Sequence, residues 1–94
     1  MKFPFSDAPD VATIVCGHVI DGGKPILYVS HDDDDGMWQF LCGDEHTTDD
    51  ARIVSLQFVF ELDHSIGELA DMPCGHFATR SCQEGKWLIQ KEGL

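Results

Sequence analysis

Short apolar runs, most of them separated by turn-forming residues, dominate the chain and predict strands. They are rich in β-branched and aromatic residues, which favour extended structure. The runs that predict strands are 11–20, 26–30, 38–42, 52–56, 77–80 and 87–90. Between the first two runs, Asp21-Gly22-Gly23-Lys24 supplies a tight turn, so we expect these two strands to pair as a hairpin.

The middle of the chain fits a strand or a helix. Residues 57–62 are apolar enough for a strand or for a buried helical turn. Residues 63–70 fit a short helix, capped by Asp63 or Ser65 and ended by Pro73. The pattern as a whole predicts an α+β fold, with a small antiparallel sheet of about five strands and one or two short helices on one face.

The length of 94 residues allows one domain. Residues 1–10 hold two prolines and two acids and predict an irregular N-terminal arm, and residues 11–94 form the single α+β domain. No apolar run approaches the ~18–20 residues of a membrane span. The first residues also lack the apolar segment of a secretory signal, so we expect a cytoplasmic protein that does not bind membranes.

Charge is the most distinctive property of the composition. Seventeen Asp and Glu residues against six Lys and Arg give a net charge of −11, and residues 31–50 hold eight of the acids and no Lys or Arg. Such a field repels nucleic acid and attracts a basic protein, although hydrated loops without a partner are the plainer alternative. A homodimer through an exposed sheet edge is a further alternative. The predicted partner-binding residues are Asp32, Asp33, Asp34, Asp35, Trp38, Asp44, Glu45, Asp49 and Asp50.

Trp38 has two interpretations. It directly follows the first acidic loop, which is the composition of an interface anchor with a charged rim. An aromatic residue in an apolar run is also typical of the core of a sheet.

The four cysteines raise the question of a metal site. Cys-Gly-His occurs as Cys16-Gly17-His18 and as Cys74-Gly75-His76. Residues two apart in a strand face the same way, so two such pairs could supply Cys16, His18, Cys74 and His76 to a tetrahedral zinc ion. The spacing differs from that of ordinary structural zinc sites, so packed, reduced thiols and no cofactor are the main expectation.

The sequence contains none of the common catalytic motifs considered next. The sequence contains no Gly-x-Ser-x-Gly, phosphate loop or His-Glu-x-x-His. A thiol enzyme would at least require a cleft that holds a cysteine within hydrogen-bonding reach of an imidazole. We therefore expect a protein without enzymatic activity.

A longer pattern carries a family resemblance. The acid-rich loop leads into Gly36-Met37-Trp38-Gln39-Phe40 and then Gly43-Asp44-Glu45. The pattern continues through Val54-Ser55-Leu56, Asp63, Ile66, Leu69, Pro73, Gly75, Phe77 and Arg80. Over roughly residues 11–90 the chain resembles a bacterial domain of unknown function related to the immunity-protein-thirty-three-like family of polymorphic-toxin immunity proteins. The resemblance implies a small α+β domain without enzymatic activity that binds another protein. The chain would then be an immunity protein, and the bound protein a toxin that it occludes.

Overall fold

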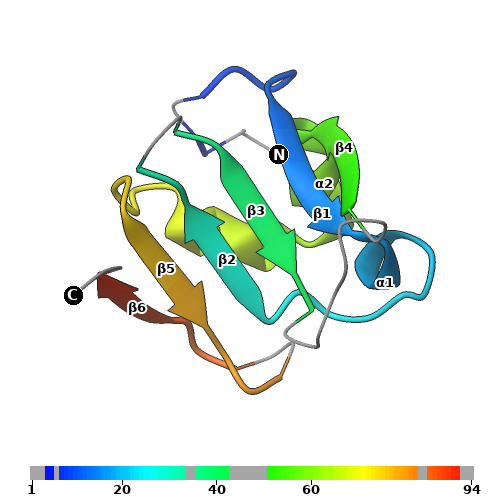
Figure 1. Cartoon of the computed structure of the whole chain (residues 1–94). Coiled ribbons are helices and arrows are strands. Elements are labelled where there is room, and N and C mark those ends of the chain that lie inside the picture. The colour runs from blue at the N-terminus through cyan, green and yellow to red at the C-terminus, as the bar shows by residue number, and fades with distance from the viewer. Residues whose placement is uncertain (1–3, 6, 34–35, 43–50, 83–84, 92–94) are drawn as a thin grey trace.

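A computed structural model of the chain describes residues 4–5, 7–33, 36–42, 51–82 and 85–91. In this part of the chain, six strands form one sheet in the order β4-β1-β3-β2-β5-β6 (Figure 1). The strands are β1 (Ala12–Cys16), β2 (Tyr28–His31), β3 (Trp38–Leu41), β4 (Ala51–Ser55), β5 (His76–Thr79) and β6 (Leu88–Lys91). The predicted α+β class is confirmed.

Strand pairing differs from the expected antiparallel sheet at one place. β1 and β3 run parallel, whereas the other four pairs of neighbours are antiparallel, so the sheet is mixed. The predicted hairpin between the first two strands is wrong. β1 lies between β3 and β4, and β2 lies between β3 and β5, because each strand finds its partners farther along the chain.

The first predicted strand is also too long. It ends at Cys16, and residues 17–20 form the short helix α1 (Gly17–Ile20). β-branched residues such as Val19 and Ile20 favour a strand locally. The helical turn nevertheless places Val19 in the core, where it is 4% exposed, and this burial outweighs the local preference.

Two more helices cover one face of the sheet. They are α2 (Leu56–Leu62) and the 3-10 helix η2 (His64–Leu69), and both lie behind the sheet in Figure 1. Ser55 caps α2 by accepting a hydrogen bond from the Phe58 amide, and Asp63 caps η2 by accepting one from the Ser65 amide. The ambiguous segment 57–62 is therefore helical. No helix in the described residues is long and apolar enough to cross a membrane.

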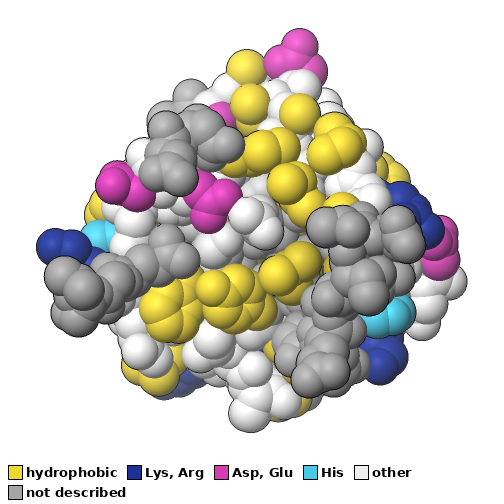
Figure 2. Space-filling model, in the orientation of Figure 1, with side chains coloured by type: hydrophobic (Ala, Val, Ile, Leu, Met, Phe, Trp, Pro, Cys, Tyr) yellow, Lys and Arg dark blue, Asp and Glu magenta, His cyan; other side chains and the backbone are white. Residues whose placement is uncertain are grey.

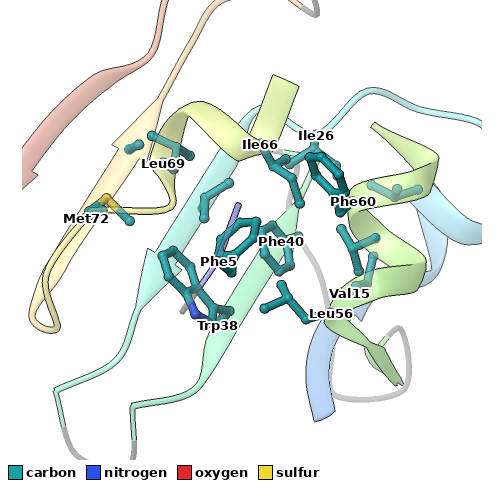
Figure 3. Close-up of a cluster of buried hydrophobic side chains, with 14 of the residues drawn as sticks. Phe5, Val15, Ile26, Trp38, Phe40, Leu56, Phe60, Ile66, Leu69 and Met72 are labelled. Atoms are coloured by element: carbon teal, nitrogen blue, oxygen red, sulfur yellow. The ribbon is translucent and has the colours of Figure 1, made fainter. Parts of the chain in front are cut away.

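The hydrophobic core lies between the sheet and these two helices (Figure 3). Phe5 from the predicted N-terminal arm belongs to it, because its ring packs edge-on against Trp38 at 5.2 Å and against Phe60 at 6.4 Å. The sheet contributes Val15, Val29, Trp38, Phe40 and Ala78 to this core, and the helices contribute Leu56, Val59, Phe60, Ile66 and Leu69. The arm thus completes the domain.

Candidate functional site

The sheet face opposite α2 and η2 carries apolar side chains. Because side chains alternate along a strand, the residues that precede the core residues Val15, Val29 and Ala78 point to this other face. Figure 2 looks onto this side and shows hydrophobic side chains gathered there. The residues that define this surface, called here the open face, are Ile14, Tyr28, Ile53, Phe77 and Leu88.

The open face extends across the sheet. Ile53 of β4 pairs directly with Ile14 of β1, and the side chain of Ile53 is 65% exposed. In the middle, the rings of Tyr28 and Phe77 stack with their centroids 5.7 Å apart. Leu88 on β6 is 59% exposed at the far edge. A contiguous exposed apolar patch is one mark of a surface that binds another protein, whereas single exposed apolar residues are common on any protein.

Asp32, one of the predicted partner-binding acids, lies on this face. Its carboxylate accepts a hydrogen bond of 2.7 Å from the Gln39 amide and one of 3.3 Å from the Ser30 hydroxyl. Ser30 and Gln39 pair across β2 and β3 and point to the same side as the open face. Asp33 is exposed beside Gly75. The predicted residues Asp34, Asp35, Asp44, Glu45, Asp49 and Asp50 lie outside the described residues.

Trp38 lies in the core, so its assignment as an interface anchor is corrected. The indole is 1% exposed, stacks on the His31 imidazole at 3.9 Å, and donates a hydrogen bond to Asp7. Its neighbour along β3, Gln39, faces the opposite side. The acidic loop therefore leads into a strand that buries Trp38 and turns the half-buried Gln39 to the other face.

The structure does not bring the two Cys-Gly-His stretches together. His76 pairs with His31 at the Trp38 end of β3, whereas Cys16 lies level with the other end, near Cys42. The four steps along the chain from Trp38 to Cys42 span about 13 Å at a strand rise of ~3.3 Å per residue. Hence one zinc ion cannot bind all of Cys16, His18, Cys74 and His76.

Each stretch instead meets a partner that sequence reasoning missed. Cys16 and His18 cluster with Cys42, and the three ligand atoms all lie within 4.8 Å of one another. Cys74 meets His31, with its sulfur 3.6 Å from Nε2. Neither partner is close in sequence to the residues it joins, and only the pairing of distant strands could have revealed them.

The contact between Cys74 and His31 borders a cleft of about 640 Å³. Imidazole Nδ1 of His31 lies 2.8 Å from the Met72 carbonyl, which can only accept, so Nδ1 carries the proton and donates it. Nε2 then presents its lone pair to the exposed Cys74 thiol. This arrangement meets the minimum stated above for a thiol with a neighbouring base.

Comparisons of the chain with family models, with curated proteins and with solved structures find no match.

Proposed function

We propose that this protein is a non-catalytic protein-binding module whose open face, with Asp32 upon it, binds a basic protein. An immunity protein that neutralises a toxin is the form of such a module that the sequence resemblance suggests. The observation that carries the proposal is the exposure of Ile53 and Leu88 on the sheet face that α2 and η2 do not cover.

The chemistry of the open face supports a protein as the ligand. Tyr28 and Phe77 offer large, rigid side chains, which dominate the energy of many protein interfaces. Aliphatic residues lie on both sides of them, and the Asp32 carboxylate supplies a charged acceptor at the rim. An apolar centre with a polar rim is the usual composition of such interfaces.

The charge of the chain favours a basic partner over a second copy. Two copies would each carry −11 and would place their Asp32 carboxylates on a shared interface, where like charges repel. A partner rich in Lys and Arg would be attracted at long range and would pair with Asp32 on contact. The same charge disfavours nucleic acid.

The proposal leaves Cys74 and His31 without a catalytic role. A nucleophile and a base also need a substrate site and groups that stabilise the developing charge. The proposal keeps the cytoplasm as the location, where exposed thiols such as Cys74 and Cys82 stay reduced.

Photo-crosslinking from defined positions tests the proposal. Tyr28 is replaced by the photoreactive amino acid p-benzoylphenylalanine, which keeps an aromatic ring, and the protein is irradiated in a lysate of its source cells. We expect crosslinks to one basic protein, identified by mass spectrometry, that weaken as salt is raised. The matched control carries the same group at Phe58, which is 43% exposed on α2 across the sheet. Equal crosslinking from Phe58, or crosslinks only between copies of this chain, would contradict the proposal.

A further inference from the structure

Cys16, His18 and Cys42 meet at the carboxyl ends of β1 and β3, because these two strands run parallel. The carboxyl ends of parallel neighbours lie at the same edge, so Cys16 at the end of β1 comes close to Cys42, which directly follows β3. After Cys16 the chain turns at once into α1, and this turn returns His18 to the same edge. The cluster thus depends on both the parallel pairing and the helix that shortens the first predicted strand.

The distances within the cluster match those between ligands of one metal ion. A tetrahedral zinc ion ~2.3 Å from sulfur and ~2.0–2.1 Å from nitrogen holds those two atoms about 3.6 Å apart. Cys42 Sγ and His18 Nδ1 are separated by 3.5 Å. The same geometry places two sulfur ligands about 3.8 Å apart, within the 4.8 Å that bounds all three ligand atoms. Little movement is needed for all three to bind one ion.

Burial and charge favour a cation there. Cys16 is 1% exposed and Cys42 is 4% exposed, whereas His18 is half-buried and gives a route from solvent. Two buried thiolates would be costly without a positive charge, and a divalent ion neutralises both. The net charge of −11 also raises the local concentration of cations.

We propose that Cys16, His18 and Cys42 form a binding site for a thiophilic metal ion of the Zn²⁺ class. Two sulfurs and one imidazole hold the ion and leave its fourth position to water or an external ligand. Three protein ligands are also the number found in the zinc sites of enzymes. Thiolates select Zn²⁺ over Mg²⁺ and Ca²⁺, which take oxygen ligands. The three ligands are not among the residues that define the open face, and the proposal does not depend on the proposed protein partner.

Metal titration of the whole chain tests this proposal. The purified protein is reduced, stripped with a chelator and titrated with Zn²⁺ against a competing indicator, and native mass spectrometry counts the bound ions. Co²⁺ replaces Zn²⁺ in a parallel titration, because thiolate ligands give it an intense charge-transfer absorption. We expect one ion per chain, with this absorption for Co²⁺.

Matched variants assign the ligands. His18→Asn, on a half-buried residue, and Cys42→Ser should each weaken Zn²⁺ binding by at least about 100-fold. Cys74→Ser and His76→Asn remove the same residue types from the second Cys-Gly-His stretch and should leave the affinity within about twofold. Circular dichroism checks that each variant folds. If Cys42→Ser does not fold, the Zn²⁺ affinity of His18→Asn alone tests the proposal. A chain that binds no Zn²⁺ when reduced overturns the proposal. So does Co²⁺ without the thiolate absorption, or a loss of affinity in the two controls that equals the loss in His18→Asn.

Discussion

The guanidinium of Arg80 lies 2.8 Å from the carboxylate of Asp63 in the interior of the protein, where the Arg80 side chain is 1% exposed. Arg80 also donates hydrogen bonds to the Ile26 carbonyl and the Ser65 hydroxyl, and its guanidinium stacks over the Trp87 ring at 4.1 Å. One side chain thus joins the end of β5 to the junction between α2 and η2. These contacts tie the junction between the two helices to the end of β5.

Removing one member of this buried pair should destabilise the protein strongly. Arg80→Met or Asp63→Asn leaves the other charge buried without its partner, which costs about 3–5 kcal/mol of the free energy of unfolding. Urea denaturation measures the loss. Arg52→Ala is the matched control, because Arg52 and Asp21 form an ion pair whose side chains are 43% and 65% exposed. The control should lose at most about 1 kcal/mol, and equal losses at both sites would contradict this account.

Trp38 should matter for stability and not for partner binding. Trp38→Phe removes part of a buried ring system and should cost about 1–3 kcal/mol, because the contacts with Phe5 and His31 are reduced. The affinity for a partner, measured under conditions where the variant is fully folded, should stay within about twofold. A large loss of affinity in the folded variant would show that Trp38 contacts the partner after all.

The thiols should differ in reactivity according to their burial. Iodoacetamide should alkylate the exposed Cys74 and Cys82 well before the buried Cys16 and Cys42, as peptide mass spectrometry can follow. His31→Phe keeps a ring against Trp38 and removes the Nε2 atom that lies 3.6 Å from the Cys74 sulfur. This variant should slow the alkylation of Cys74 by at least about threefold, with the rate at Cys82 as the internal reference. An unchanged rate at Cys74 would mean that His31 does not act on it.

The position of a charge on the surface should matter more than its presence. Asp32→Asn and Asp71→Asn remove the same unit of charge, but Asp32 lies over the open face and Asp71 is exposed beyond η2. We expect Asp32→Asn to slow association with the basic partner and to reduce its dependence on salt. Asp71→Asn should change both much less. Surface plasmon resonance at several salt concentrations measures the two rates, and equal effects would leave only a general role for the net charge.

Local pattern predicted the strands better than it predicted their partners. The runs at 38–42 and 77–80 correspond to β3 and β5, because both are short, contain aromatic residues that favour extended structure and lie near turn-forming glycines. Asp63, one of the two predicted caps of the short helix, caps η2, whereas Ser65 donates its amide to Asp63. The parallel pairing of β1 with β3 leaves no trace in either segment, since it depends on long-range packing.

The candidate sites depend on the same long-range pairings. Cys42 and His31 could not be assigned as partners of Cys16 and Cys74 without knowing which strands are neighbours. Trp38 lies on the core side of its strand, although the local composition was compatible with both a core residue and an interface residue. The open face is likewise defined by which side of the sheet the helices cover, and this depends on the long-range packing of α2 and η2 against the core residues of the sheet.

The affinity for the partner captured by crosslinking tests the central claim most directly. Isothermal titration calorimetry compares a double variant of the open face, Ile53→Ser with Leu88→Ser, and a double variant of α2, Phe58→Ser with Leu62→Ser. All four side chains are between 43% and 65% exposed, so folding should be affected equally little. We predict that the open-face variant weakens binding about 10- to 100-fold and the α2 variant less than about threefold. Unchanged affinity in the first variant, or a greater loss in the second, would contradict the claim that the open face binds the partner.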